Sequence, residues 1–395
     1  MIFDFSEKSG LLLVFFVHGI VFATLLLVQG IQHERKSSLW LAGFTLLGCL
    51  YIAPFMLGYA GWYGLDGYRE FLFYAPLQQL FLIGPVMYFY VQRLLNPDTS
   101  IRRISYLHFL PAAGYLLYAL IIFVCDRFVF ETVYFYADGR DKDFAVWYQV
   151  AGFVSMFFYF ALTLHHYRRY KALAFQSVSY ADSIVHRWME RYLTAFLVML
   201  TLRILFFALN PEWGQFGSKF WYYLCFAALL YYISLAGYVR AVQVLATNSL
   251  LPAPGFHFRQ DQLPNDLHPV TADEADDALP DLAQWKEKLD AIMIADRLYE
   301  NPGLTLQHVS AALGVTPRLV SNLVNQGFAM NFNDYVNRHR TRAVVGKLEA
   351  GEQRTKTLLA LAFECGFNSK STFNRAFKKE IGVTPREFLL KNILK

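Results

Sequence analysis

Cysteine is scarce in this chain and stands in no ligand pattern. The 395 residues include four cysteines, and none belongs to a CxxC pair or to a cluster of cysteine and histidine. Cys49, Cys125 and Cys225 fall in or beside apolar runs, where cysteine usually acts as a small packing residue. The sequence therefore predicts no disulfide framework and no metal site, and it implies no cofactor.

Charged side chains are also scarce, at 17% of the residues, and they are unevenly distributed. Residues 1–250 are dominated by long apolar runs. Residues 251–284 contain seven acidic residues and one basic residue, whereas residues 285–395 contain 17 Lys and Arg against 10 Asp and Glu. The basic excess lies mostly at the C-terminal end, where a polyanion is the expected partner.

Groups that would support catalysis are missing from the sequence pattern. His108, His165 and His166 lie near the ends of apolar runs, and no carboxylates or further ligands accompany them in sequence. We therefore do not expect an enzyme. A membrane enzyme with an appended regulator is the alternative that polar groups converging on a buried pocket would favour.

Seven apolar runs in residues 1–250 are each long enough to cross a bilayer, which takes about 20 residues. Each run is predicted to be a helix, because backbone polar groups need partners inside the bilayer. The first run lacks a preceding basic segment and a small-residue cleavage site, so it is not interpreted as a signal peptide. The predicted spans are Gly10–Gln29, Leu39–Gly61, Phe71–Leu95, Ser105–Cys125, Phe144–Tyr167, Tyr192–Leu209 and Gly217–Val239.

Positive charges at the ends of these runs predict their orientation. Eleven Lys and Arg residues flank one side and six flank the other. The richer side is expected to be cytoplasmic. This places the N-terminus outside and, after seven spans, the C-terminal part inside. The sequence thus predicts a multi-pass membrane protein in contact with lipid.

The segment between the apolar runs and the basic region has the composition of a linker. Residues 251–284 contain five prolines and an acidic excess, without apolar periodicity. Such a composition is typical of a flexible connector.

Two helix-turn-helix patterns follow. In residues 304–326, LTLQHVSAALGVTPRLVSNLVNQ, apolar positions recur at helical spacing on both sides of Gly314, which permits a tight turn. Thr316 is placed to cap the second helix, and Pro317 to occupy its first position. This order of helix, turn and capped helix is typical of a helix-turn-helix unit.

The same pattern returns in residues 357–382, TLLALAFECGFNSKSTFNRAFKKEIG. Ser369 is placed to cap the second helix of this unit. Phe373 and Phe377, four positions apart, are expected to face the core. The other faces carry Lys370, Ser371, Asn374, Arg375 and Lys378. Arg and Asn form bidentate contacts with base edges, whereas Lys378 and Lys379 suit phosphates.

A long helix is predicted between the two units, from Asn331 to Ala350. At 1.5 Å per residue it would be about 30 Å long. Successive major grooves on one face of DNA lie about 34 Å apart. A connector of this length could place two recognition helices in neighbouring grooves of one duplex.

The chain from about Gln284 to Lys395 resembles the AraC/XylS family of transcription regulators. The stretch ALAFECGFNSKSTFNRAFKKEIGVTPREF carries most of the similarity, and NFNDYVNRHRTRAVVGKL resembles the connecting helix of that family. The resemblance implies an AraC-type double helix-turn-helix domain that binds double-stranded DNA. The DNA-contacting residues that it implies are Arg318, Ser321 and Asn322 in the first unit and Lys370, Ser371, Asn374 and Arg375 in the second.

The apolar part resembles the membrane-embedded sensor regions joined to such domains in some bacterial regulators, through LIGPVMYFYVQRLLNP and HFLPAAGY. Polar residues inside predicted spans are candidates for a signal site. Arg203 could hold an anionic ligand. The alternatives are pairing with an acid such as Asp126, or extension of the side chain to the outer interface. Gln78 and Gln79 are further candidates, but interhelical hydrogen bonds are the favoured interpretation of both and of His18.

Together these features predict an all-α protein. A seven-helix transmembrane bundle (1–250) precedes a flexible linker (251–284) and an AraC-type double helix-turn-helix DNA-binding domain (285–395). The predicted function is that of a membrane-integral one-component transcription regulator, controlled by an unidentified small-molecule or protein signal. RNA polymerase and a second copy of the chain are further expected partners. The alternative is a transporter- or receptor-like protein whose cytoplasmic tail binds a protein partner.

Overall fold

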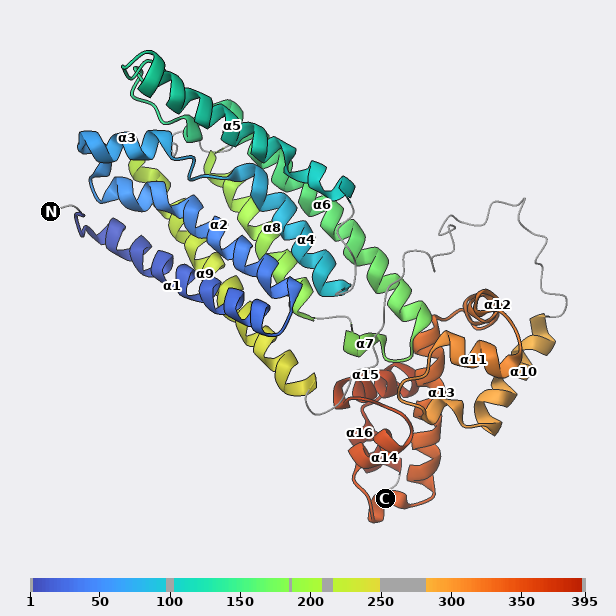
Figure 1. Ribbon diagram of the computed structural model, residues 1–395. Helices are drawn as coiled ribbons and strands as arrows, with labels where there is room; N and C mark the ends of the chain where they lie inside the picture. Colours follow the sequence, from blue (N-terminus) through green and yellow to red (C-terminus); the bar gives the residue numbers. More distant parts are fainter. Residues whose placement is uncertain (1–2, 97–102, 185–186, 208–215, 249–281, 393–395) are drawn as a thin grey trace. The chain divides into compact units, whose positions relative to one another are not determined.

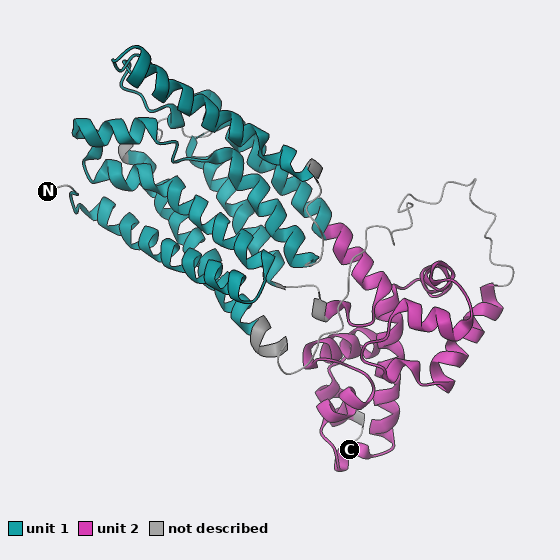
Figure 2. Ribbon diagram, in the orientation of Figure 1, with its two compact units in different colours: residues 1–167, 187–253 teal, residues 168–186, 254–395 magenta. Residues whose placement is uncertain are grey.

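The computed structural model describes residues 3–96, 103–184, 187–207, 216–248 and 282–392, which form helices joined by turns (Figure 1). Within these residues the only β-structure is an isolated bridge between Val178 and Thr305. The chain divides into two compact units, residues 1–167 with 187–253 and residues 168–186 with 254–395 (Figure 2).

The first unit is a helix bundle with α2 inside it. Helix α2 contacts α1, α4 and α9. The apolar stretch of α2 is 67% buried and that of α1 only 22%. The helices of the bundle are α1 (Glu7–Gln32), α2 (Lys36–Tyr59), α3 (Asp66–Tyr74), α4 (Leu80–Leu95), α5 (Leu110–Val124), α6 (Val146–Ser177), α8 (Arg187–Phe207) and α9 (Phe216–Asn248).

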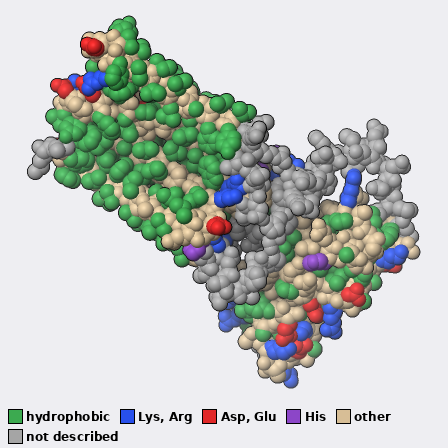
Figure 3. All heavy atoms as spheres, viewed as in Figure 1, with side chains coloured by type: hydrophobic (Ala, Val, Ile, Leu, Met, Phe, Trp, Pro, Cys, Tyr) green, Lys and Arg blue, Asp and Glu red, His purple; other side chains and the backbone are tan. Residues whose placement is uncertain are grey.

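Five helical segments of this unit are long and apolar enough to cross a membrane. They are Glu7–Gln32, Lys36–Tyr59, Ser105–Val129, Val146–Ser177 and Ser218–Gln243. Large apolar side chains such as Val14 and Val154 are exposed on the first unit, and green apolar atoms cover much of the side of this unit seen in Figure 3. An apolar surface of this extent suits lipid rather than water. The segments therefore indicate a multi-pass membrane protein.

The third predicted span is not one helix. Helices α3 and α4 are separated by residues 75–79. Pro76 has no N–H to donate, and the preceding Ala75 is extended, with φ −84° and ψ 111°. The Gln78 backbone N–H donates to the Asp143 carboxylate at 2.9 Å. The prediction of a continuous helix over Phe71–Leu95 is therefore wrong.

Two further predicted spans are helical but are not among the five long apolar segments. Helix α4 has 16 residues and is shorter than the five long segments. Helix α8 is helical from Arg187 to Phe207 but carries four charged residues. The end of its predicted span, residues 208 and 209, lies outside the described residues, as does the predicted linker up to residue 281. Helix α10 begins at Leu282, so residues 282–284 are helical.

Two apolar clusters of the second unit share one helix. Helix α13 contributes Phe332 and Val336 to the first cluster and Val344 and Leu348 to the second. Asn331 caps its N-terminus, which confirms the predicted connecting helix. The helices of this part are α10 (Leu282–Ala295), α11 (Leu306–Leu313), α12 (Pro317–Asn322), α13 (Phe332–Glu349), α14 (Leu358–Glu364), α15 (Lys370–Ile381) and α16 (Pro385–Asn392).

The second unit also includes residues 168–186. These residues are the C-terminal part of α6 and the short helix α7 (Ala181–Ile184). The division drawn from the sequence assigns them to the membrane domain. In the structure the Ser179 backbone N–H donates to the Leu304 carbonyl at 3.0 Å, directly before α11.

Candidate functional site

The first helix-turn-helix unit is formed by α11 and α12. Gly314, between them, has a φ of +69°, which favours glycine. The Thr316 hydroxyl accepts a hydrogen bond from the Leu319 N–H at 3.3 Å, and Pro317 is the first residue of α12, both as predicted. Among the predicted DNA-contacting residues, Arg318 is exposed, whereas Ser321 and Asn322 are half-buried.

The second helix-turn-helix unit is formed by α14 and α15. Gly366 has a φ of +89° in the turn between them. The Ser369 hydroxyl accepts from the Thr372 N–H at 3.1 Å, which confirms the predicted cap. Phe373 and Phe377 are 2% and 0% exposed, so they face the core as predicted.

Helix α15 presents a polar face opposite these phenylalanines. Its exposed residues include the whole set predicted to contact DNA in this unit: Lys370, Ser371, Asn374, Arg375 and Lys378. Arginine, asparagine and lysine on one exposed helix face provide donors both for base edges and for phosphates. The face thus has the chemistry of a recognition helix.

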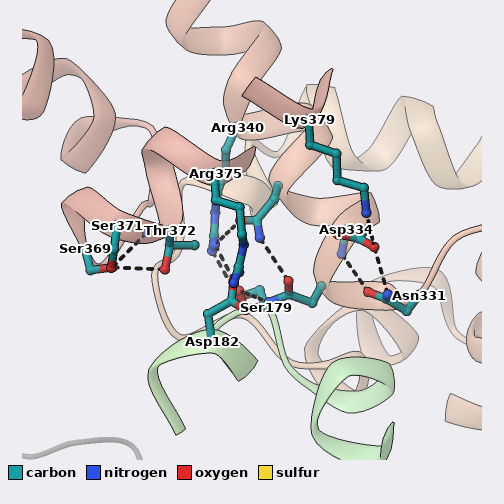
Figure 4. Close-up of polar contacts among 12 residues, drawn as sticks. Ser179, Asp182, Asn331, Asp334, Arg340, Ser369, Ser371, Thr372, Arg375 and Lys379 are labelled. Atoms are coloured by element: carbon teal, nitrogen blue, oxygen red, sulfur yellow. Dashed lines mark hydrogen bonds and ion pairs between the residues drawn. The ribbon is translucent and has the colours of Figure 1, made fainter. Parts of the chain in front are cut away.

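Two basic side chains of α15 already have partners in the protein. The Lys379 ammonium lies 2.7 Å from the Asp334 carboxylate on α13. Arg375 forms an ion pair with Asp182 of α7 (Figure 4). Neither pairing follows from the sequence pattern, because both partners lie far away along the chain.

Arg340 of α13 is a polar core residue that the sequence analysis missed. Its side chain is fully buried and donates to the carbonyls of Tyr299 and Asn301, each at 2.8 Å, and to the Ser179 hydroxyl at 3.0 Å. Burial lowers the pKa of Arg340, since all these acceptors are neutral. Its spacing, four residues from Val336 and from Val344, places it on the buried face of α13 and could have revealed it.

In the first compact unit, which holds the five long apolar segments, Arg203 is buried and only 6% exposed. Its guanidinium donates to the Tyr51 hydroxyl at 3.1 Å and to the Gln149 side-chain oxygen at 2.7 Å. The Asp126 carboxylate instead accepts from the Tyr74 hydroxyl at 2.8 Å. The alternative that Arg203 pairs with Asp126 is therefore wrong, whereas extension to the outer interface stays a prediction.

The predicted interhelical hydrogen bonds are confirmed in part. The Gln78 amide donates to the Tyr51 carbonyl at 3.0 Å and to the Tyr223 hydroxyl at 3.2 Å. His18 of α1 contacts the Ser234 hydroxyl of α9 at 3.4 Å. The Gln79 amide, in contrast, donates to the carbonyl of nearby Pro76, so the interhelical prediction fails for Gln79.

Arg203 also lines a cavity of about 340 Å³ in the membrane unit. Gln149 and Lys219 are the other polar residues in its lining, which is otherwise apolar and aromatic, with Phe55 and Phe153 among its members. Gln78 and Gln79 do not line it. Gln149 and Lys219 are not among the candidates predicted from the sequence, although both lie near the ends of predicted spans.

Comparison with known families supports the assignment of helix-turn-helix units to the C-terminal part of the chain. Residues 309–391 match the family model described as a helix-turn-helix domain. The match begins within α11 and ends within α16, so it extends over both helix-turn-helix units. The chain thus ends in a DNA-binding domain of the helix-turn-helix class. More narrowly, this domain is of the AraC type. Neither the curated proteins nor the solved structures yield a match.

Proposed function

We propose that this protein is a membrane-integral one-component transcription regulator. The observation that carries the proposal is the combination, in one chain, of an AraC-type helix-turn-helix domain and five long apolar helices. In such a protein a signal at the membrane reaches DNA without a second protein. A signal molecule needs only to bind one conformational state better than another.

The two helix-turn-helix units bind double-stranded DNA sequence-specifically in this proposal. In α12 the contacts come from Arg318, Ser321 and Asn322, and in α15 from Lys370, Ser371, Asn374, Arg375 and Lys378. The exposed polar face of α15 supports these assignments. The length of α13, 18 residues or about 27 Å, suits two recognition helices in neighbouring major grooves.

The proposed topology places the N-terminus outside a bacterial inner membrane and the DNA-binding domain in the cytoplasm. Helices α4 and α8 join the five long segments in a seven-helix bundle that covers residues 1–250. The linker 251–284 then connects it to the domain 285–395. Inner-membrane lipid, RNA polymerase and a second copy of the chain complete the set of proposed partners. The asymmetric distribution of Lys and Arg supports this orientation.

The cavity at Arg203 is the proposed signal site. Arg203 and Lys219 supply two positive charges, and the hydrogen-bond acceptors of Arg203 are neutral groups. The nearby Asp143 carboxylate, next to the lining residue Phe144, does not line the cavity. It accepts hydrogen bonds from the Tyr115 hydroxyl and from the Gln78 backbone N–H. Charged residues inside membrane proteins usually mark functional sites. The ligand class that fits is an amphiphile with an acidic head and an apolar body.

Gln78 and Gln79 contribute to the proposed signal site indirectly. The Gln149 amide donates to the Gln78 side-chain oxygen at 2.9 Å, and Gln79 is the next residue along the chain.

Selection from a library of random-sequence duplexes tests the proposed function. The full chain in lipid nanodiscs should enrich a defined sequence and bind it at least about 1000-fold more tightly than random duplex, with affinity that falls steeply as salt rises. Enrichment of no sequence would contradict the proposal. Stable capture of a protein partner in place of DNA would favour the receptor-like alternative.

A further inference from the structure

Residues 178–182, which follow α6 directly, are packed into the DNA-binding unit. Val178 is 2% exposed and Ser179 is fully buried. Val178 pairs with Thr305 in the isolated antiparallel β-bridge, and Thr305 is the N-cap of α11. We call residues 178–182 the docking segment.

Ser179 supplies acceptors to two polar side chains of α13. The Asn333 amide donates to its carbonyl at 2.8 Å. The Arg340 guanidinium donates to the same carbonyl at 3.3 Å and to the Ser179 hydroxyl at 3.0 Å (Figure 4). A buried guanidinium needs such acceptors, because an unsatisfied buried charge is costly. The N-terminal half of α13 thus supplies the donors that receive the docking segment.

Asp182 brings the docking segment to the second recognition helix. Its carboxylate forms an ion pair with Arg375 of α15, and its side chain is only 5% exposed. Figure 4 shows Arg375 reaching from α15 toward Asp182, beside Ser179. Arg375 is the residue of α15 best suited to contact guanine. Its ion-pair partner, Asp182, lies outside the two helix-turn-helix units.

This ion pair and base reading compete for the same guanidinium. A bidentate contact to guanine needs the guanidinium donors of Arg375 turned to the base edge. A carboxylate held at that guanidinium competes for the donors and also repels DNA phosphates. The docked arrangement is therefore unfavourable for DNA binding by α15.

We propose that the docking segment is an intramolecular lock on the second recognition helix, in which Asp182 occupies the guanidinium of Arg375 until the segment is released. The inference rests on the proposed function, because it assigns the regulation of the same DNA-binding face. Helix α6 provides the covalent route for release. It runs unbroken from Val146 to Ser177, so that Gln149 at one end lines the Arg203 cavity while the other end continues into the docking segment.

Asp182→Asn tests the lock. Asparagine keeps the shape and an acceptor oxygen but removes the charge. The full-length variant in nanodiscs should bind the duplex enriched by the selection at least about fivefold more tightly than the unmodified protein. The matched control is Glu380→Gln, which removes one negative charge from α15 itself, where Glu380 pairs with Arg342 at 3.1 Å. The control should leave the affinity within about twofold.

A reversible cross-link tests the lock from the opposite direction. Paired residues of an antiparallel bridge have Cα atoms about 4.5 to 5.5 Å apart, within reach of a disulfide. The double variant Val178→Cys with Thr305→Cys, when oxidised, should bind the enriched duplex at least about fivefold more weakly than the same protein after reduction. Because both forms carry the same substitutions, loss of the Thr305 cap affects them equally. The single variant Val178→Cys controls for oxidation of the native cysteines.

The outcomes separate the lock from the proposed function. Selective DNA binding that is unchanged, or weakened, by Asp182→Asn and insensitive to the cross-link would overturn the lock and leave the proposed function intact. Weakening by Asp182→Asn would mean that Asp182 positions Arg375 for base reading instead. Absence of selective binding in every form would contradict both.

Discussion

At the residue scale, Gly366 is a position of the second helix-turn-helix unit with no room for a side chain. Its φ of +89° disfavours any side chain, and a Cβ would lie 2.3 Å from the Tyr299 carbonyl oxygen. The turn is pressed against the loop before α11, where the Asn368 amide also donates to the Pro302 carbonyl at 3.1 Å. Glycine here lets the two units of the domain approach each other.

Gly366→Ala should lower the free energy of opening of α14 and α15 by about 2 to 4 kcal/mol, from the left-handed backbone and the clash combined. Hydrogen exchange of the full chain in nanodiscs measures the change. The matched control is Gly346→Ala in α13, where a Cβ meets nothing within 4 Å. That substitution should stabilise α13 by about 0.5 to 1 kcal/mol. Equal effects of the two changes would contradict the packing argument.

His339 makes the stability of the DNA-binding unit depend on pH. Burial lowers its pKa below the ordinary value of 6.5, although the Asp290 carboxylate, 3.1 Å away, opposes this shift. The folded state therefore binds fewer protons than the unfolded state as pH falls below about 6.5. Stability is retained above that pH and is lost as pH falls toward the lowered pKa.

The expected result is faster exchange of α13 amides at pH 5.5 than at pH 7.5, after correction for intrinsic exchange rates. The loss cannot exceed about 1.4 kcal/mol per pH unit for one group. His339→Gln should remove most of this dependence. His308→Gln is the control, because His308 is exposed and glutamine also suits its capping-box position. An unchanged pH profile in His339→Gln would rule out this histidine as the cause.

At the element scale, α15 combines a structural face and a recognition face in one short helix. The phenylalanines fix its position, because Phe373 and Phe377 belong to the same apolar cluster as Val344 and Leu348 of α13. The Ser369 cap fixes where the helix begins. Residues on the opposite face are therefore free to vary in chemistry without loss of the fold.

Arg375→Ala and Lys378→Ala should separate the two kinds of DNA contact. Loss of Arg375 should cost about 1 to 3 kcal/mol on the enriched duplex and relax selectivity, whereas loss of Lys378 should weaken binding to all duplexes alike and reduce the salt slope by about 1. Both changes are made in the Asp182→Asn background, so that no buried carboxylate is left without its ion pair. Equal losses on every sequence for both variants would refute these roles.

At the scale of the whole molecule, two compact units share the helix α6. The first unit has an apolar exterior and a cavity with two cationic residues. The second unit holds both helix-turn-helix units and the docking segment. Gln149 of α6 lines the cavity, and α6 ends at Ser177, directly before the docking segment. In the proposed mechanism, α6 therefore connects the signal site to the docking segment.

The charge of the cavity predicts which ligands bind. Dodecanoate should raise the melting temperature of the full chain in zwitterionic nanodiscs, whereas dodecanol of equal chain length should raise it less. Arg203→Gln should remove this difference. Lys142→Gln should not, because Lys142 pairs with Asp138 and does not line the cavity. Nanodiscs with anionic lipid distinguish a lipid headgroup from a free acid, since lipid already in the site would abolish the dodecanoate shift. Equal shifts with the acid and the alcohol would contradict an anionic ligand.

Most of the α-helical structure could be predicted from the sequence because its causes are local. Apolar runs of sufficient length predict membrane helices, and the five long segments coincide with predicted spans. Thr316, Ser369 and Asn331 cap helices through backbone groups three residues away, so short sequence windows contain both partners. Pro76 indicates the helix break in the sequence, but it lies within a long apolar run that also fits a single spanning helix.

By itself, then, the sequence determined an apolar helical part, two helix-turn-helix units and a long helix between them, because periodicity and capping act over a few residues. Only the tertiary structure decided the partners of isolated charges. Arg375 meets Asp182, Arg340 meets Ser179, and Arg203 meets Tyr51, each across more than a hundred residues of chain. An ion pair or hydrogen bond depends on which segments the fold brings together, and no local pattern records that choice.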